Sequence, residues 1–435
     1  MLGLFLYIYF MKIDAIHQLF LDCTSICTDT RKVKNNCLFF ALSGEKFNGN
    51  TFANEALTKG AKYAIIDDAK FKTSDNTILV ENSLKTLQEL ATYHREYLGL
   101  KIIALTGSNG KTTTKELINV VLSKKYNTTA TVGNLNNHIG VPLTLLSMDK
   151  NTEIGIVEMG ANHKKEIAFL CNIAKPDYGY ITNFGKAHLE GFGGIEGVIK
   201  GKSEMYDYLI SNNKLIFYNA EDTIQEEKLR DYNSKVGFSN NNTTDYNYTL
   251  LDTNPFVTFK TEDIVIKSNL IGAYNFTNLC AASTIGRHFE VTLNQIQTAV
   301  KDYTPTNNRS QIINQGSNSI ILDAYNANPS SMDVALKNFS IQDAKNKIAI
   351  LGDMFELGDS APEEHQNIVN LLSFLDIDKV ILVGENFYTT NTDNSNLEKY
   401  KSFEDFKNNY KTIKDSALLI KGSRGMALER VLELL

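Results

Sequence analysis

The feature that most constrains the fold is an apolar segment that ends in a glycine-rich loop and continues as a helix. The stretch "LKIIALTG" (100–107) has the composition of a buried strand, and "KTTTKELINVVLSKK" (111–125) repeats apolar residues at helical spacing. Between them, "TGSNGKTTTKE" (106–116) brings glycine, lysine and threonine together. A strand, a glycine-rich turn and a helix N-terminus in this order are typical of a phosphate-binding loop.

The loop is two residues shorter than the Walker A pattern G-x-x-x-x-G-K-[ST], because Gly107 lies only three residues before Gly110. Both glycines allow backbone N–H groups to approach an anion closely. Lys111 can reach phosphate oxygens, the Thr112 hydroxyl can ligate Mg²⁺, and Thr113 is a further donor. A plain strand-to-helix turn would not need glycine, lysine and threonine together, so we predict a nucleotide-binding loop.

Further candidates for the metal follow later strands. Glu158 ends the strand "EIGIVEMG" and is expected at the carboxyl edge of the sheet, beside the loop, where Mg²⁺ needs a carboxylate. His188 precedes a glycine-rich turn and could bind a second Mg²⁺. Taken alone, however, an acidic strand end is often a solvated turn residue, a lone histidine is more often a packing or surface residue, and Lys202 reads as a surface lysine.

The totals limit the classes of protein that remain. A chain of 435 residues is too long for one core and suggests two to four domains. A net charge of -6 argues against a general polyanion-binding surface. The five scattered cysteines lack a C-x-x-C pair, which argues against a zinc site or a disulfide scaffold and fits a reducing cytoplasm.

The first ten residues, "MLGLFLYIYF", are too few to span a bilayer and lack the preceding positive charge of a signal peptide. We predict an extension ahead of a start at Met11, where "MKIDAIHQLF" indicates an amphipathic helix. A membrane-surface anchor and an ordinary buried segment are the alternatives.

The order of strands and helices predicts an α/β chain of three domains at 1–98, 99–308 and 309–435. In the first, "NCLFFALSG" and "AKYAIIDD" predict strands, "TFANEALTKG" predicts a helix closed by Gly60, and a helix from Ser83 to Leu98 is expected to end at Gly99. In the second, strands such as "DYGYITNFG" alternate with helices and predict a mostly parallel sheet around the loop.

The third domain shows the rhythm of a Rossmann-like fold. The strands "SIILDAY", "KIAILGD", "KVILVGE" and "ALLIKGS" leave room for one helix between each pair. No G-x-G-x-x-G follows any of them, so we infer no NAD.

Together these motifs resemble the Mur ligases of peptidoglycan synthesis. "TGSNGKTTTK", "GNLNNHIGVPLTLL", "EMGANHKKEI", "TNFGKAHLEGFG" and "KGKSEMY" occur in that family's order. "DAYNANPSSM", "LGDMFELGDSAPEEH" and "KGSRGMALE" resemble the members that add D-alanyl-D-alanine, and "CTDTRKVKNNCLFFALSGEKFNGNTFANEAL" fits the family's uridine-nucleotide domain. The resemblance runs from about Met11 to the end. The short loop, T-G-x-N-G-K-T, is shared with folylpolyglutamate synthetases.

The resemblance implies a fold, a reaction and its ligands. It predicts a small N-terminal UDP-binding domain, a central ATP-binding domain and a C-terminal Rossmann-like domain. ATP with Mg²⁺ would phosphorylate the terminal carboxylate of a UDP-N-acetylmuramoyl tripeptide, and the amine of D-alanyl-D-alanine would attack the resulting acyl phosphate. Family members of this kind act in the cytoplasm, and we expect a monomer that binds no nucleic acid and does not insert stably into a membrane.

The resemblance also implies roles for residues of the central domain. It assigns the binding of the ATP phosphates to the loop residues Gly107, Ser108, Asn109, Gly110, Lys111, Thr112 and Thr113. Glu158 resembles the carboxylate ligand of the first metal, and His188 resembles the ligand of the second. Lys202 stands where the family has a carbamylated lysine, which would help to hold the second metal. The chain has "GKSE" where the family often has "AKGE", but Lys202 and Glu204 keep their spacing.

Other positions are implied to contact the nucleotides. Asn275 and Asn278 resemble asparagines that contact the nucleotide in the family. Arg309 resembles an arginine that binds phosphate. Asp323 resembles the aspartate that binds the ribose, and Asn326 would lie close to the adenosine. For the uridine substrate the candidates are Asp29, Thr30, Arg31, Phe47 and Asn137. The acceptor contacts are the least defined: "DMFELG", the loop before His365 and "KGSRGM" (421–426) are candidates.

Two other classes remain open on sequence grounds. A sister ligase, either a tripeptide-forming Mur ligase or a folylpolyglutamate synthetase, would use a different acceptor. A non-enzymatic nucleotide switch would keep Lys111 but would need none of Glu158, His188 and Lys202. The sequence also leaves open whether the third residue of the tripeptide is meso-diaminopimelate or L-lysine.

Overall fold

The structure, a computed structural model, describes residues 11–241 and 244–435. The predicted extension before Met11 lies outside the described residues. The chain divides into two compact units: the first contains the residues up to Ala104 with Tyr126–Gly160 and Ala168–Tyr178, and the second contains the remainder. The division into domains at 1–98, 99–308 and 309–435 stays a prediction.

The N-terminal region is a parallel sheet with helices, as predicted. Its strands lie in the order β1-β2-β3-β4. The elements are α1 (Ile13–Leu21), β1 (Ile26–Cys27), β2 (Leu38–Phe40), α2 (Ala53–Thr58), β3 (Tyr63–Ile66), β4 (Thr77–Leu79) and α3 (Ser83–Leu98). The predicted end of α3 is confirmed, because Gly99 adopts φ 62° and donates its N–H to Arg95.

Two buried histidines join α1 to α3. The Nε2 of His17 lies 3.0 Å from the Nδ1 of His94, whose Nε2 lies 2.9 Å from the carbonyl oxygen of Met148. The ring of Tyr93 packs against His17. Burial, together with the neighbouring His94, lowers the pKa of His17 to about 4. The pair therefore fits this core only in its neutral form.

The central sheet contains seven strands in the order β11-β10-β9-β8-β5-β7-β6. The strands are β5 (Lys101–Thr106), β6 (Thr128–Ala130), β7 (Ile154–Glu158), β8 (Tyr178–Ile181), β9 (Leu215–Asn219), β10 (Lys235–Ser239) and β11 (Tyr246–Asn247). The helices of this region are α4 (Lys111–Leu122), α5 (Gly140–Leu145), α6 (Glu166–Ala174), α7 (Leu189–Phe192), α8 (Ile195–Ser211), α9 (Thr223–Leu229), α10 (Tyr274–His288) and α11 (Leu293–Asp302). The predicted strand, loop and helix around Lys111 are confirmed.

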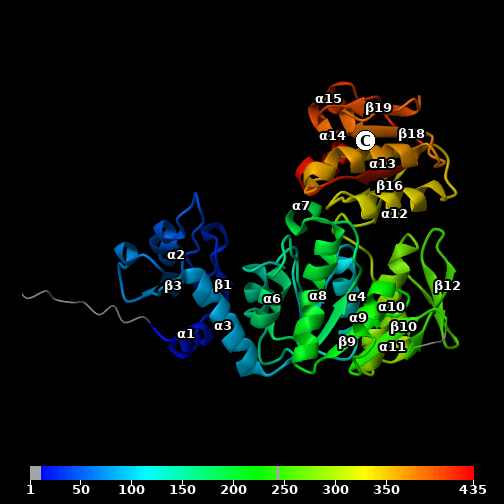
Figure 1. Cartoon of the computed structure of the whole chain (residues 1–435). Coiled ribbons are helices and arrows are strands. Elements are labelled where there is room, and N and C mark those ends of the chain that lie inside the picture. The colour runs from blue at the N-terminus through cyan, green and yellow to red at the C-terminus, as the bar shows by residue number, and fades with distance from the viewer. Residues whose placement is uncertain (1–10, 242–243) are drawn as a thin grey trace, which may run out of the picture. The chain divides into compact units, whose positions relative to one another are not determined.

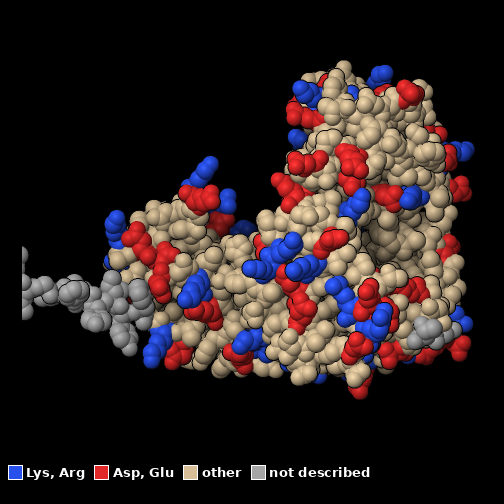
Figure 2. Space-filling view, viewed as in Figure 1, with Lys and Arg blue, Asp and Glu red and all other residues tan. Residues whose placement is uncertain are grey.

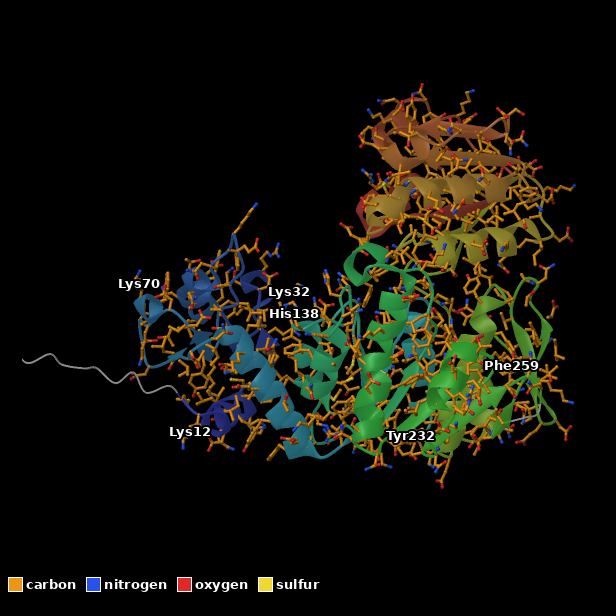
Figure 3. The ribbon with its side chains drawn as sticks, in the orientation of Figure 1. Lys12, Lys32, Lys70, His138, Tyr232 and Phe259 are labelled. Carbon is orange, nitrogen blue, oxygen red and sulfur yellow. The ribbon has the colours of Figure 1, made fainter. Side chains whose placement is uncertain are left out.

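A small antiparallel sheet was not apparent from the sequence. Its strands are β12 (Thr249–Asp252), β13 (Thr258–Thr261) and β14 (Ile264–Lys267). Phe259 of β13, labelled in Figure 3, is fully buried and packs edge-on against Phe276 of α10. Strands as short as these carry too few alternating residues to give a clear periodic signal.

The C-terminal region is a six-stranded sheet in the order β15-β16-β20-β17-β18-β19. Its elements are β15 (Gln311–Gln315), β16 (Asn318–Asp323), α12 (Pro329–Ser340), β17 (Lys347–Gly352), α13 (Ala361–Leu372), β18 (Lys379–Val383), α14 (Glu385–Tyr388), β19 (Leu397–Tyr400), α15 (Phe403–Asn408) and β20 (Ala417–Lys421). The four predicted strands are confirmed, and α12 and α13 lie side by side (Figure 1). The antiparallel edge strand β15 was not predicted.

The surface and the cysteines agree with the sequence totals. On the face drawn in Figure 2, basic and acidic side chains of the described residues are interspersed. The five cysteines, all described, form no disulfide. Among the described residues, no helix combines the length and the apolar character that crossing a membrane requires.

The His17 pair makes the stability of the chain depend on pH. The pKa of His17, about 4, lies below the ordinary 6.5. The stabilisation of the fold by neutral His17 is therefore complete above pH 6.5 and is lost as pH falls toward 4. The shift corresponds to roughly 3 kcal/mol at most. We expect urea unfolding, followed by tyrosine fluorescence, to show a smaller loss between pH 7 and pH 4.5 in His17→Phe than in wild type. Equal losses in both proteins would contradict this assignment.

Candidate active site

The glycines of the phosphate loop are required by their surroundings. A Cβ atom on Gly107 would lie 2.0 Å from the hydroxyl oxygen of Thr182, and one on Gly110 would lie 2.7 Å from Oδ1 of Asn278. Their φ angles are 140° and 77°, which favour glycine. The backbone of the loop therefore runs close to its neighbours and leaves its N–H groups before the N-terminus of α4.

The end of β8 and the segment after it hold the loop. Ser108 donates its N–H to the Asn183 carbonyl and its hydroxyl to the Gly185 carbonyl, at 3.0 and 2.7 Å. Thr182 donates its hydroxyl to the carbonyl of Asn109 at 2.6 Å. Sequence reasoning missed Thr182, Asn183 and Gly185, although they lie in "ITNFGKAH".

Lys111 and the threonines lie where the motif predicts. The Lys111 ammonium donates to the carbonyls of Gly107 and Ser108, at 2.7 and 3.1 Å, so it lies over the loop itself. Thr112 is buried in the first turn of α4 and Thr113 is half-buried. A cation and a hydroxyl group thus stand at the helix N-terminus, which is the arrangement that binds phosphate.

Asn275 and Asn278 lie behind the loop, in the first turns of α10. Asn278 accepts a hydrogen bond from the Thr114 hydroxyl at 3.0 Å and donates to Oδ1 of Asn275 at 2.9 Å. Asn275 donates in turn to the Ile271 carbonyl. Both side chains are buried, so in this structure they brace α4.

Glu158 ends β7 in the first unit, and it is almost fully buried. Its Oε1 accepts a hydrogen bond from Asn136 at 2.7 Å, whereas Oε2 has no hydrogen-bond partner among the described residues. A buried carboxylate oxygen is rarely left without a partner. This oxygen therefore fits a cation such as Mg²⁺, which prefers carboxylate ligands.

Lys202 is not the surface lysine that its composition suggested. It is fully buried in α8, donates to the Ala161 carbonyl at 3.1 Å, and lies 5.1 Å from the centre of the Phe192 ring. Burial lowers the pKa of Lys202 well below its ordinary value, and the charge of Lys111 adds to this effect. Burial therefore favours the neutral, nucleophilic amine.

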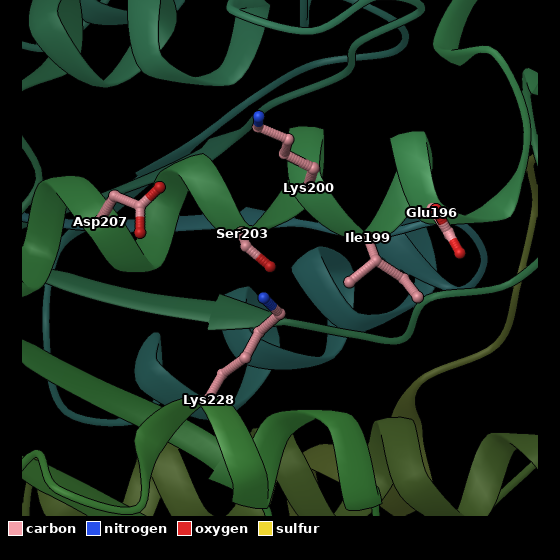
Figure 4. A pocket seen from close by; sticks show the side chains of 6 residues that line it. All are labelled: Glu196, Ile199, Lys200, Ser203, Asp207 and Lys228. Atoms are coloured by element: carbon pink, nitrogen blue, oxygen red, sulfur yellow. The ribbon is translucent and has the colours of Figure 1, made fainter.

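The outer face of α8 borders a shallow groove rather than the core. Its lining residues are Glu196, Ile199, Lys200, Ser203 and Asp207 of α8 and Lys228 of α9 (Figure 4). None of these residues belongs to the predicted site. Lys200 and Lys202 thus provide an exposed and a buried lysine on one helix.

His188 adopts the left-handed conformation, with φ 53°, directly before α7. Its Nδ1 lies within hydrogen-bonding distance of the carboxylate of Glu356, which belongs to the segment after β17. The hydrogen bond from His188 lowers the pKa of Glu356, and the charges of His188 and Lys111 lower it further. His188, Lys111 and Glu356 are therefore electrostatically coupled.

The predicted adenosine residues meet at the end of β16. Asp323 pairs with Lys421 of β20 at 2.5 Å and accepts the Ser310 N–H at 3.0 Å. Arg309 stacks on the ring of Tyr325 at 3.9 Å, and the Asn326 carbonyl also accepts from Lys421. The sequence predicted that Lys421, in "KGSRGM", suits an anionic ligand; in the structure it pairs with the carboxylate of Asp323.

Hydrogen bonds also connect the phosphate loop to the start of α12. Asn328 donates to Oδ1 of Asn109 at 2.8 Å. Lys186 donates its N–H to the hydroxyl of Ser330 at 2.8 Å and pairs with Glu364 at 2.6 Å. Sequence reasoning missed Asn328, although it lies in the quoted motif "YNANPSSM".

The candidates for the uridine substrate lie in the first unit. Asp29 caps a short 3₁₀ helix (Thr30–Lys32) and pairs with Arg31, whose side chain is 85% exposed. The ring of Phe47 is exposed and stacks on Phe52 at 5.3 Å. The Asn137 side chain instead accepts hydrogen bonds from the N–H groups of Ile139 and Gly140, at the start of α5.

Family models match along most of the chain. The Mur ligase family catalytic domain matches residues 22–95, the Mur ligase middle domain matches 105–286, and the Mur ligase glutamate ligase domain matches 308–429. The UDP-N-acetylmuramoyl-tripeptide--D-alanyl-D-alanine ligase of Bacillus subtilis (strain 168) is 33% identical over 94% of this chain and 92% of its own length. The chain belongs to the Mur ligase family.

Solved structures of Mur ligases have the same fold. A MurF crystal structure from Acinetobacter baumannii matches with a TM-score of 0.84 and 28% identity, over 97% of this chain and 98% of its own. A MurF ligase structure from Thermotoga maritima, solved in complex with ADP, matches with a TM-score of 0.82 and 27% identity, over 95% and 97%. The predicted three-part α/β fold of a Mur ligase is thereby confirmed.

The position of Lys111 leads to a direct test. Lys111→Ala removes the ammonium group at the loop and should lower ATP-dependent turnover about 100-fold or more, as expected when a donor to a developing oxyanion is lost. Lys124→Ala, which removes the ion pair of Lys124 with Asp302 just after the end of α4, serves as the control. The measurement is phosphate release, and a Lys111→Ala enzyme within twofold of wild type would rule out this role.

Proposed function

We propose that the chain is an ATP-dependent, ADP-forming amide ligase that joins D-alanyl-D-alanine to a UDP-N-acetylmuramoyl tripeptide, through an acyl phosphate, in the synthesis of peptidoglycan precursors. The observation that carries the proposal is the extent of the likeness. Relatives named for this reaction are 30–34% identical over 94% of the chain, which includes the motifs expected to contact the acceptor. That the enzyme is cytoplasmic and monomeric stays a prediction.

ATP is proposed to bind at the short loop. The N–H groups at the N-terminus of α4 and the dipole of that helix attract the phosphates, whereas the N–H groups of Ser108 and Asn109 already donate to Asn183. Lys111 would leave its two loop carbonyls to reach the phosphate oxygens. Asp323 and Asn326 are proposed for the ribose and adenosine, with Arg309 close to them. Because Asp323 pairs with Lys421, the same contact would orient its carboxylate.

Mg²⁺ is proposed to bind with the help of Thr112, Glu158, His188 and Lys202. Among the described residues, no group of three His, Cys, Asp or Glu side chains is placed to hold a metal alone. Mg²⁺ normally takes one or two carboxylates together with substrate phosphates, which suits the free Oε2 of Glu158. Bound Mg²⁺ would neutralise the phosphate oxygens that face the attacking carboxylate.

Lys202 is proposed to act as a carbamate. A neutral lysine amine can add carbon dioxide and release a proton, which forms a C–N bond and leaves a carboxylate-like anion. The burial of Lys202 favours that neutral amine, and an anion at this position would remove its repulsion with Lys111.

The overall reaction is tested by phosphate release from Mg-ATP. The UDP-muramoyl tripeptide is supplied with either meso-diaminopimelate or L-lysine as its third residue, with and without D-alanyl-D-alanine. We expect release to need the tripeptide and the dipeptide, and mass spectrometry to show a product enlarged by one dipeptide. Release only with another acceptor would assign the chain to a sister ligase.

The lysine pair on α8 gives a sharper test of the metal role. Lys202→Ala should lower turnover about 100-fold or more while the affinity for ATP changes little, because the loop is untouched. Lys200→Ala, on the outer face of the same helix, should leave turnover unchanged. Equal turnover in the two variants would remove Lys202 from the mechanism.

A further inference from the structure

The segment "DMFELG" (353–358) follows β17 and places the carboxylate of Glu356 against His188. The carbonyl of Glu356 accepts the N–H of Glu190 at 3.3 Å, and its side chain pairs with His188. Half of the Glu356 side chain stays exposed, with a value of 50%, so the carboxylate can contact a ligand as well as His188.

The backbone of this segment is held by its neighbours. The Asp353 carboxylate accepts the N–H groups of Asn386 and Phe387, each at 2.9 Å. The next N–H, of Met354, donates to the buried ring of His365, again at 2.9 Å. The one after it, of Phe355, donates to the hydroxyl of Ser423. Three successive residues therefore fix the backbone that leads to Glu356.

Glu356 itself has a φ angle of 62°. A residue other than glycine persists in this left-handed region when the surrounding structure imposes it, and such residues cluster at functional sites. The hydrogen bonds that fix residues 353–355, together with the contact between Glu356 and α7, impose this left-handed conformation here. As a result the carboxylate is presented at one fixed place, against the imidazole of His188.

We propose that Glu356 binds the ammonium group of the incoming amino acid or peptide acceptor and holds its amine beside the phosphate loop. The proposal rests on the proposed function, which requires an acceptor with a primary amine. A primary amine is mostly protonated at neutral pH, so the acceptor arrives as an ammonium cation that a fixed carboxylate attracts. The open half of the Glu356 carboxylate, beside His188, supplies that anion and accepts hydrogen bonds from the ammonium.

The test compares Glu356→Gln with wild type in the full-length enzyme. The KM for D-alanyl-D-alanine should rise about 10-fold or more, because a charge-assisted hydrogen bond becomes a neutral one. The KM values for ATP and for the tripeptide should stay within twofold. Exchange of labelled ADP into ATP, measured with the tripeptide but without the dipeptide, should also stay within twofold, since acyl phosphate formation precedes the acceptor.

Two further measurements separate binding from a structural effect. D-lactyl-D-alanine has a hydroxyl group in place of the ammonium, so its inhibition constant should not change in Glu356→Gln. Glu356→Asn tolerates the left-handed backbone and should show the same selective rise in KM if folding is intact. Glu363→Gln, which changes an exposed carboxylate in the first turn of α13, is the matched control and should behave as wild type.

Each other outcome contradicts the inference. Loss of the ADP–ATP exchange in Glu356→Gln would show that the carboxylate acts on the metal or the nucleotide rather than on the acceptor. An unchanged KM for the dipeptide, or an equal rise for all substrates and for D-lactyl-D-alanine, would exclude a site for the ammonium. Failure of the proposed function is distinguishable, because wild type would then show no dipeptide-dependent turnover.

Discussion

The nucleotide loop depends on the close approach of the Gly107 backbone to Thr182. Any side chain at residue 107 would collide with that hydroxyl, and the same hydroxyl holds the carbonyl of Asn109. The loop is thus shaped by strand β8 on one side and by the brace of Asn278 on the other. A loop two residues shorter than the Walker A pattern can still present its N–H groups because its neighbours, rather than its length, set its curvature.

The loop and the segment that holds it are also bonded to the C-terminal region. Asn109 accepts a hydrogen bond from Asn328 at the start of α12, and Lys186, directly after Gly185, contacts Ser330 and Glu364. These contacts are hydrogen bonds and one ion pair, each of modest net stability. A site assembled from such contacts can be rearranged by a ligand that makes stronger ones.

Sequence reasoning succeeded where a residue's role is local. The strand, loop and helix at Lys111 follow from periodicity and from glycine, and the helix end at Gly99 follows from its freedom at positive φ. It failed where a role depends on distant partners. Nothing near Lys202 in the sequence reveals that Ala161 and Phe192 bury it, and nothing near Lys421 reveals its pairing with Asp323. Similarly, the buried hydrogen bonds of Asn275 and Asn278 are visible only in three dimensions, while their contact with the nucleotide stays a prediction.

The pinned segment around Asp353 has a consequence for how such ligases change. Its shape is set by backbone donors and by Asp353, His365 and Ser423, none of which needs the side chain at position 356. Residue 356 can therefore be exchanged, within the small set of side chains that accept a left-handed backbone, without redesign of the scaffold. Evolution, or an engineer, could retarget the amine-bearing substrate by altering this one position while the machinery that activates the carboxylate is inherited intact.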